Sequence, residues 1–508
     1  MPDTVDTTIF SMSHRIVIHH RFVPWLLLSL VLVVGLGVRL VDLNQQGETW
    51  DEVAYYDAAH HFFNNLQHRD FNADHWDANH EHPPVAKFIY MAVSIPSFET
   101  DTPDQFGAGR VASSAMGLLT VCLVFLIGRR LANNRVGLLA AVTLAFLPIF
   151  IAFNLVYGLD TPTTFFFALT AWVFLEAIMR RNHWLYLLAA LVAGLAIGTR
   201  LSNLLVLPAL LSMWVIWRWP FTKKTGFQRV ELVHVLTYAT VPFLAFFATW
   251  PWLWTSNWQN HLSQTFGHWS AVVVPYLGKI VVAPVPYYAV YFLAVTPGLF
   301  IVLFGYFVWR ALKSMRREWL VVLAWFVVPF AFSFFGTRQG GFRYMLQVMP
   351  AMALGVGLAL DQLLERMKRR DQVVLIGVFL VYLAIQVLAV RPYYLDYYNE
   401  FVGGPKVVAA HRWFQVGWWN EGTEATVNWF NTHVDASAGV AYLAIPDRSE
   451  RLLWDTGSAT DLAHARYVIT NPNAEWFTTD PHRLDGFHVI HEETALGAPI
   501  ASVYERNQ

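Results

Sequence analysis

Long apolar blocks dominate the chain, and each is close to the length that crosses a lipid bilayer. The first is WLLLSLVLVVGLGVRLVDL, which follows Pro24. A transmembrane helix needs about 20 predominantly apolar residues. Of the 508 residues, 56% are hydrophobic and 14% are charged, whereas soluble domains carry about 25% charged residues. The blocks therefore predict a polytopic α-helical membrane protein.

We predict about eleven spanning segments from length and flanking charge. They lie near residues 23–42, 110–129, 136–153, 162–179, 184–199, 201–218, 231–252, 287–309, 319–336, 344–363 and 372–390. Strongly basic connections such as MRRNHW and LLERMKRRD fall at every second loop, and cytoplasmic loops retain Lys and Arg. The pattern predicts a plasma-membrane protein with a cytoplasmic N-terminus and an external C-terminal part.

The last quarter of the chain has the composition of a soluble domain. EGTEATVNWFNTHV has helical spacing, and GVAYLAI, ARYVIT and FHVIHEE are typical of short strands. We expect a membrane domain at 1–391, with a long first external loop at 43–109, and a small external α/β domain at 392–508. The formal net charge of −1 does not indicate a nucleic-acid partner, and the single Cys122 excludes a disulfide framework or a cysteine metal cluster.

Acidic residues are concentrated where the first apolar block ends, in ETWDEVAYYDAAHHFF. Glu48, Asp51, Glu52 and Tyr55 are spaced to share one face of a helix, and KFIYMAVSIPSF further along predicts a helix lying in the interface. Solvated surface acids are one interpretation. The other is a general base, since a carboxylate beside an apolar boundary has a raised pKa. The residues alone favour neither.

A second polar stretch of the same loop is NHEHPPVAK. Its two prolines fix the backbone direction, and they are equally typical of a helix start. The functional interpretation places Glu81, His82 and Lys87 near the same cavity as the acids. The loop is rich in histidine, but a strong zinc spacing such as HExxH does not occur. Ordinary polar packing is therefore favoured over a metal site.

Other candidate residues lie at the outer ends of later spans. Asp160, in LDTPTTFFF, is a good helix cap, yet an acid at this depth is costly unless it is used. The basic residues of the external side are few, and either snorkel at the interface or hold a phosphate; they are Arg200, Lys279, Arg338 and Arg343. His268 stands beside an aromatic cluster that suits either an interfacial belt or sugar stacking.

The order of these blocks resembles that of the protein O-mannosyltransferase family and its bacterial relatives, which include the aminoarabinose transferase of lipid A and the family-39-type glycosyltransferases. The matching motifs are WDE, HPPVAK, LDTPTTFFF, GLAIGTR, FGH…YLGK…PVPYY, FRYMLQVMP and YYNEFVGG, within residues 20–405. The resemblance implies a GT-C fold and an inverting transfer of a hexose or pentose from a polyprenyl-phosphate donor to an acceptor hydroxyl.

The resemblance also implies roles for individual residues. Asp51 matches the catalytic base, Glu52 its acidic neighbour and Asp160 the second acid. Arg200 replaces the usual lysine. Glu81 and His268 match positions that bind zinc in the aminoarabinose transferase, although the family's chemistry does not need a metal in general. The cations then stabilise the leaving phosphate, which His82 and Lys87 are also expected to contact, and the substrate-binding residues are expected to be Glu48, Tyr55, Glu81 and His268. The expected partners are membrane lipids, the lipid-linked donor and a protein, lipid or glycan acceptor.

The main rival hypothesis is a membrane transporter or flippase. Transporters usually carry ionisable groups at mid-membrane and internal repeats, whereas here the spans are nearly free of charge and the acids cluster on one external face. An oligosaccharide-transferring enzyme of related fold would need a clear metal-binding acid motif, which the sequence lacks. A receptor or scaffold would not explain the acidic cluster.

Overall fold

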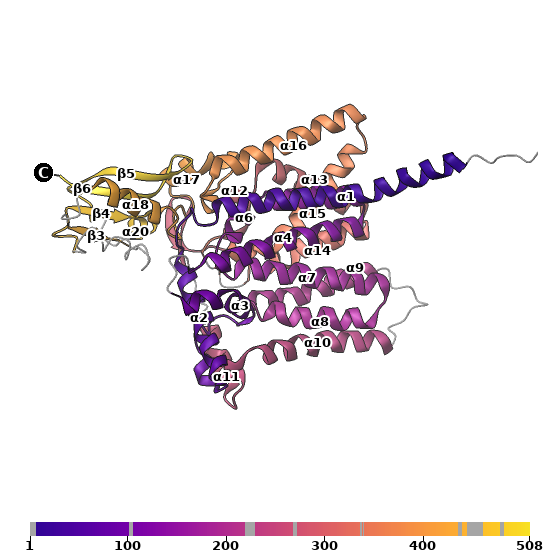
Figure 1. Ribbon diagram of the computed structural model, residues 1–508, viewed down its shortest axis with the longest axis horizontal. Coiled ribbons are helices and arrows are strands. Elements are labelled where there is room, and N and C mark those ends of the chain that lie inside the picture. Colours follow the sequence, from indigo (N-terminus) through magenta and orange to yellow (C-terminus); the bar gives the residue numbers. More distant parts are fainter. Residues whose placement is uncertain are drawn as a thin grey trace, which may run out of the picture.

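The structure is a computed structural model of the 508-residue chain. It describes residues 7–100, 105–218, 229–267, 272–335, 338, 340–434, 439–443, 461–477 and 482–507. Figure 1 shows a bundle of helices that carries a smaller α/β part at one end. The helices of the bundle are α1 (Thr7–Asp42), α4 (Gly107–Leu131), α5 (Asn134–Ala145), α6 (Pro148–Asn154), α7 (Asp160–Arg180), α8 (His183–Ile197), α9 (Val206–Arg218), α10 (Arg229–Thr249), α12 (Tyr287–Val295), α13 (Gly298–Ser314), α14 (Arg317–Phe332), α15 (Met349–Leu364) and α16 (Arg369–Val390).

The protein is a multi-pass membrane protein. By length and composition, 6 helices of the described residues can cross a membrane, or up to 8 if each of two bent pairs counts as one span. Two further apolar helices, α8 and the Val233–Thr249 part of α10, are shorter. Every predicted spanning segment coincides with a helix or a helix pair, whereas the number of crossings, about eleven, stays a prediction.

Two predicted spans are not single straight helices. The α5–α6 pair bends by 65° and the α12–α13 pair by 120°. The residue before the proline is extended at both breaks, at Leu147–Pro148 and at Thr296–Pro297. Proline lacks an N–H and pushes its predecessor out of the helical region. Each of the predicted spans 136–153 and 287–309 is therefore a pair of helices with a bend at a proline.

Helix α15 lies at the centre of the bundle. In the apolar window that includes it, 94% of the residues are buried, against 17% for α1 and 22% for α16. The two outer helices therefore present apolar side chains to the surroundings, as lipid-facing helices do. Helices α4 and α5 approach closely, because a Cβ on Gly137 would lie 2.5 Å from the carbonyl oxygen of Phe125. Small residues allow such backbone contact between membrane helices.

The segment 43–100, predicted as the first external loop, folds into short helices that lie across one end of the bundle (Figure 1). These are α2 (Trp50–Gln67), the 3₁₀ helix η1 (Ala73–Trp76) and α3 (Val85–Glu99). Helix α2 begins at Trp50, and the Glu52 carboxylate accepts a hydrogen bond from the Thr49 backbone N–H at 2.9 Å. Glu48 thus precedes the helix, and the prediction that it shares a helical face with Asp51 was wrong.

Later loops add further short elements. They are η2 (Leu201–Leu205), η3 (Pro251–Leu253), α11 (Trp258–Gly267), η4 (Arg343–Val348) and a hairpin of β1 (Val273–Tyr276) and β2 (Lys279–Val282). The C-terminal part contains η5 (Tyr394–Asp396), η6 (Glu400–Val402), α17 (Gly404–Ala410), α18 (Thr423–His433), α20 (Pro472–Trp476), β3 (Val440–Tyr442), β4 (Tyr467–Thr470), β5 (Phe487–Ala495) and β6 (Ala498–Arg506).

The C-terminal strands form one sheet in the order β3-β4-β6-β5, parallel between β3 and β4 and antiparallel elsewhere. Helix α18 packs on it through Val427 and Phe430. The predicted helix and three predicted strands are present, and β6 is an additional strand. The sheet is not detached from the bundle, because Trp419 and Ile500 belong to the same hydrophobic core as the membrane helices.

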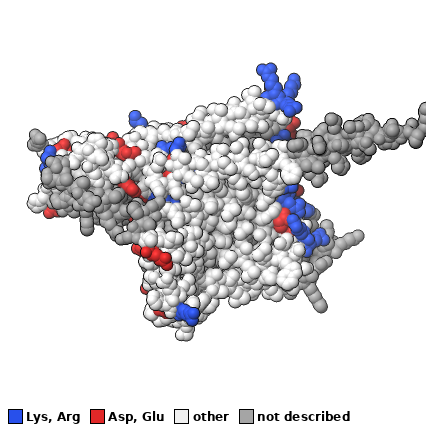
Figure 2. All heavy atoms as spheres, in the orientation of Figure 1, with Lys and Arg blue, Asp and Glu red and all other residues white. Residues whose placement is uncertain are grey.

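Charge is unevenly distributed along the bundle. Figure 2 shows Lys and Arg gathered at the end away from the C-terminal part, whereas most acidic side chains visible on this face lie toward that part and the first external loop. This asymmetry is what the alternation of basic loops predicts. Which end faces the cytoplasm stays a prediction.

Candidate active site

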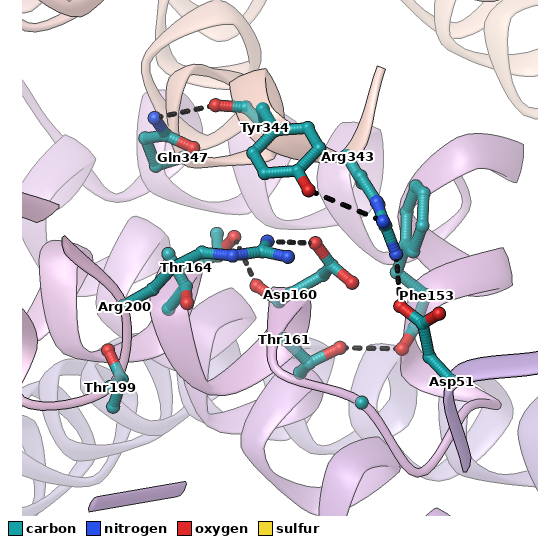
Figure 3. A network of polar contacts seen from close by, with 12 residues as sticks. Asp51, Phe153, Asp160, Thr161, Thr164, Thr199, Arg200, Arg343, Tyr344 and Gln347 are labelled. Carbon is teal, nitrogen blue, oxygen red and sulfur yellow. Dashed lines mark hydrogen bonds and ion pairs between the residues drawn. The ribbon is translucent and has the colours of Figure 1, made fainter. Parts of the chain in front are cut away.

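Two acid–arginine pairs lie close together (Figure 3), and one of them begins in α2, at the end of the bundle that α2 and α3 cover (Figure 1). Asp51, in the first turn of α2, forms an ion pair with Arg343, the first residue of η4. Asp160, the first residue of α7, forms an ion pair with Arg200, which directly precedes η2. Four segments far apart in the sequence thus bring together four of the predicted site residues.

Tyr344 connects the two pairs. Its hydroxyl oxygen accepts a hydrogen bond from Arg343 Nη2 at 3.3 Å. The guanidinium carbon of Arg200 lies 4.5 Å from the centre of its ring, and that of Arg343 lies 5.1 Å away. Aromatic faces attract cations at these distances. The sequence contained this residue in FRYMLQVMP, but only the fold shows that both arginines contact its ring.

The two pairs differ in burial. The Arg200 and Asp160 side chains are 1% and 3% exposed, whereas those of Arg343 and Asp51 are 15% and 27% exposed. The pair on α7 is therefore the inner one, and the pair on α2 is the one that solvent or a substrate can reach. Asp51 is the more accessible carboxylate, as a proton acceptor for an incoming hydroxyl must be.

Both arginines have nitrogen atoms without a partner. In the described part of the chain, Nε and Nη2 of Arg200 and Nε of Arg343 are buried and make no hydrogen bond. A buried donor without a partner costs about 1–3 kcal/mol, and more when the group is charged. Buried guanidinium groups with spare donors are suited to binding a phosphate, whose oxygen atoms accept several hydrogen bonds at once.

Tyr55 and His82 line the same site. The Tyr55 hydroxyl donates to Asp51 Oδ2 at 3.4 Å, and its ring centre lies 6.1 Å from that of His82. Burial and the neighbouring Asp51 raise the pKa of Tyr55 well above its usual value. Burial, together with Arg200 and other cations, lowers the pKa of His82 well below its usual value. Both side chains are therefore neutral, and neither adds charge to the arginine network.

Lys87 stabilises a loop. Its ammonium group donates to the carbonyl oxygens of Asn79 at 2.5 Å and His82 at 2.8 Å, and it lies 5.6 Å from the ring centre of Phe62. Burial lowers the pKa of Lys87 to about 7. The prediction that Lys87 binds a phosphate does not fit these contacts, because backbone carbonyls already occupy its donors.

Glu52 does not share a cavity with Asp51. Its side chain is fully buried, and its two oxygens accept from Arg110 Nε and Nη2, each at 2.7 Å. The Tyr157 N–H donates to Glu52 at 2.9 Å, in addition to the Thr49 N–H. Adjacent residues on a helix point about 100° apart. The expected cavity shared with Asp51 is therefore not formed, and these contacts indicate a structural role; a catalytic role for Glu52 stays a prediction.

The remaining predicted residues lie outside this network as far as their contacts show. Glu81 accepts from Asn79 Nδ2 at 2.9 Å, and Arg338 Nε donates to the Ala283 carbonyl oxygen at 2.9 Å. Glu48 is buried in the turn before α2, and Lys279 is exposed on β2. His268 lies outside the described residues.

Metal ligands are not grouped in the described part of the chain: it holds no set of three or more His, Cys, Asp or Glu side chains arranged to bind an ion. The suggested pairing of Glu81 with His268 for zinc cannot be located, because His268 is not described. Transfer without a metal stays a prediction.

Comparison with known proteins identifies relatives of part of the chain. Residues 81–254 match the family described as dolichyl-phosphate-mannose-protein mannosyltransferase. This range contains HPPVAK, LDTPTTFFF and GLAIGTR. An uncharacterized protein of Aquifex aeolicus is 26% identical over 249 residues, which are 48% of this chain. The chain spans only about half of that relative's length, 47%.

The solved structures extend the likeness to nearly the whole chain. ArnT from Cupriavidus metallidurans in the apo state is similar over 94% of this chain and 97% of its own, with 14% identity and a TM-score of 0.53. The same protein bound to undecaprenyl phosphate gives a TM-score of 0.51 over the same shares. The resemblance read from the sequence is confirmed: the chain has the helical GT-C fold of ArnT, and its residues 81–254 match the mannosyltransferase family.

Proposed function

We propose that the protein is a membrane glycosyltransferase. It transfers a sugar from a polyprenyl-phosphate donor to an acceptor hydroxyl, with inversion at the anomeric carbon. The observation that carries the proposal is the network of Asp51, Arg343, Asp160 and Arg200, in which two arginines keep buried donors without partners. The likeness to ArnT bound to undecaprenyl phosphate supports the choice of donor.

The leaving group explains the need for two arginines. In a polyprenyl-phosphate sugar the phosphate is a diester with one negative charge, and it leaves as a monoester whose charge grows toward two. Arg200 and Arg343 stabilise that growing charge best if their donors are fixed before the reaction begins. The Tyr344 ring contacts both guanidinium groups and supports their positions.

Asp51 is the proposed base. It takes the proton of the acceptor hydroxyl as the oxygen attacks the anomeric carbon, on the side opposite the departing phosphate. Attack from the opposite side gives inversion in one step, with no covalent bond to the enzyme. Asp160 stays paired with Arg200 and positions that guanidinium group.

Donor binding prepares the base in this proposal. Without donor, Asp51 is neutralised by Arg343. A phosphate that binds to Arg343 competes with Asp51 for the same guanidinium group, so the carboxylate becomes a better proton acceptor when substrate is present. The charge balance of the site favours this exchange, because two acids and two arginines sum to zero before the donor adds its negative charge.

The site faces the external side in this proposal, where lipid-linked donors present their sugars, and the N-terminus is cytoplasmic. The acceptor is a hydroxyl of a protein, lipid or glycan. A transporter is disfavoured because Asp51 and its partner Arg343 lie where α2 crosses one end of the bundle (Figure 1), whereas transport sites lie near mid-membrane.

The test is transfer by purified protein in lipid nanodiscs. Polyprenyl-phosphate donors carrying a radiolabelled hexose or pentose are supplied with peptide, lipid or glycan acceptors. The proposal expects labelled product with inverted configuration and release of polyprenyl phosphate in equal amount. Translocation of intact donor across vesicles, without cleavage of the phosphate–sugar bond for any donor, would instead support the transporter.

A further inference from the structure

A segment of the C-terminal part reaches the arginine network. We call residues 415–421 the tryptophan strap. The guanidinium carbon of Arg343 lies 5.1 Å from the ring centre of Trp419 and 5.8 Å from that of Trp418. The two indoles stack with ring centres 5.3 Å apart, and Trp419 meets Phe153 of α6 edge to face at 5.9 Å. Arg343 therefore contacts three aromatic side chains, of which two come from the strap.

Hydrogen bonds from residues outside and inside the strap hold its backbone in place. Asp396 Oδ1 accepts from the Gly417 N–H at 2.7 Å, and Glu421 Oε2 accepts from the Trp419 N–H at 2.9 Å. The Tyr398 hydroxyl donates to the Gln415 carbonyl oxygen. Two carboxyl groups thus accept hydrogen bonds from the backbone amides on either side of Trp418. These bonds fix the backbone and with it the direction of the tryptophan side chains.

The strap also packs against the sheet. Gly417 has a φ of +56°, and a Cβ there would lie 2.5 Å from the Ile500 carbonyl oxygen in β6. Its neighbour Trp418 covers Gly341, where a Cβ would meet the indole at 2.9 Å. The strap is therefore held between the sheet on one side and the segment that carries Arg343 on the other.

The two carboxyl groups are costly to bury. Both are fully buried, and neither pairs with a Lys or Arg side chain in the described residues. Burial raises the pKa of Asp396, and burial together with the nearby Asp396 raises that of Glu421. The other titratable groups near Asp396 are the phenols of Tyr291, Tyr393 and Tyr398. Sites that retain such groups are often functional.

We propose that Trp419, supported by Trp418, is a positioning residue of the donor site: it fixes the Arg343 guanidinium group where a donor phosphate binds. The C-terminal part is then an integral component of the site. This inference rests on the proposed function, in which Arg343 contacts the phosphate. An arginine side chain has several rotatable bonds, and aromatic faces that hold its planar group in place reduce the entropy lost on binding.

Binding of undecaprenyl phosphate to the full-length protein in nanodiscs tests the inference without catalysis. Trp419→Leu removes the aromatic face, Trp419→Phe restores one, and Trp429→Leu is the matched control. Trp429 lies in α18 and stacks on His491 and His433. We expect Trp419→Leu to weaken binding about 2- to 30-fold, from the strength of cation–π contacts. Trp419→Phe should recover part of the loss, and Trp429→Leu should bind as the wild type does.

Repeating the Trp419→Leu substitution in a protein that lacks Arg343 shows whether Trp419 acts through Arg343 or only stabilises the fold. In an Arg343→Gln protein, Trp419→Leu should cause no further loss, because the guanidinium group it positions is gone. An undiminished loss in that background, or wild-type binding by Trp419→Leu, overturns the inference. If Arg343→Gln itself binds as tightly as the wild type, the proposed phosphate site has failed instead. Thermal unfolding identifies variants that do not fold. If Trp419→Leu is one of them, Trp418→Leu replaces it, because Trp418 is less buried, and it too should weaken binding of undecaprenyl phosphate.

Discussion

Replacing Glu52 by Gln tests whether this acid is structural. Glu52 accepts four hydrogen bonds, two of them from the buried Arg110. Arg110 also donates to the carbonyl oxygens of Leu43 at 3.3 Å and Gly47 at 2.8 Å. The pair therefore ties the end of α1 and the start of α2 to α4. Removing one partner of a buried ion pair costs about 3–5 kcal/mol, since the other charge is left buried and uncompensated.

The assay is thermal unfolding of purified protein in detergent, followed by transfer measurements at low temperature. We expect Glu52→Gln to lower the apparent Tm by several degrees while the folded protein keeps a turnover rate within a few-fold of wild type. Glu505→Gln is the control, because the Arg466–Glu505 pair is much more exposed and such pairs are worth about 0–1 kcal/mol. The double variant Glu52→Leu with Arg110→Met should recover much of the loss, since apolar replacements of buried pairs are often neutral.

The opposite result would refute this reasoning. A Glu52→Gln protein with an unchanged Tm and a transfer rate lower by about 100-fold or more would restore the catalytic role that the sequence suggested. The double variant would then be as inactive as Glu52→Gln, because it also lacks the carboxylate.

Three further predictions follow from individual contacts. Arg200→Lys removes spare guanidinium donors, so binding of undecaprenyl phosphate should weaken roughly 10- to 100-fold, from the worth of charged hydrogen bonds; unchanged binding would contradict the phosphate site. Lys87→Met should lower the Tm but leave that binding unchanged, because Nζ is occupied by backbone carbonyls; weakened binding at an unchanged Tm would show a direct contact. Burial raises the pKa of Asp396 from 3.8 to about 7, so the folded state holds an extra proton and stability falls as pH rises from about 4 to about 7, then levels off. Asp396→Asn should flatten the difference in Tm across that window, and an equal slope in both proteins would exclude this group as its source; Glu421 acts in the same direction.

The sequence predicts where the helices of the bundle lie, because apolar length reports directly on such helices, whereas the number of crossings and their orientation stay predictions. It does not reveal the sharp turn at Thr296–Pro297, since an apolar run looks continuous when only hydrophobicity is considered. The proline was visible, but prolines inside membrane helices are tolerated when neighbouring groups satisfy the backbone. The outcome depends on packing that the sequence does not display.

Only some of the residues in the site could be predicted, because some of its contacts also depend on packing. The predicted topology places Asp51, Asp160, Arg200 and Arg343 at the same ends of their spans, and this was enough to group them. The placement of Glu52 depends on Arg110, which lies 58 residues away. Partners at that separation become visible only in the fold.

The tryptophans of the strap illustrate the same limit. The GWW of residues 417–419 lies in a part of the chain with soluble-domain composition, and nothing in its spacing connects it with Arg343. In the sequence, Asp396 and Glu421 cannot be distinguished from acidic residues on a protein surface, although both are buried. Both features acquire meaning only because the C-terminal part packs on the bundle in one continuous core.

The most direct test of the central claim compares two acids on the same helix. Asp51→Asn removes the proposed base, whereas Asp57→Asn changes an exposed residue further along α2. Both proteins are supplied with a polyprenyl-phosphate sugar that the wild type uses, and transfer is measured beside binding of undecaprenyl phosphate. General-base catalysis contributes about 10²- to 10⁴-fold, so Asp51→Asn should lose that much activity and still bind the lipid phosphate, while Asp57→Asn transfers at the wild-type rate. Full transfer by Asp51→Asn would contradict the account.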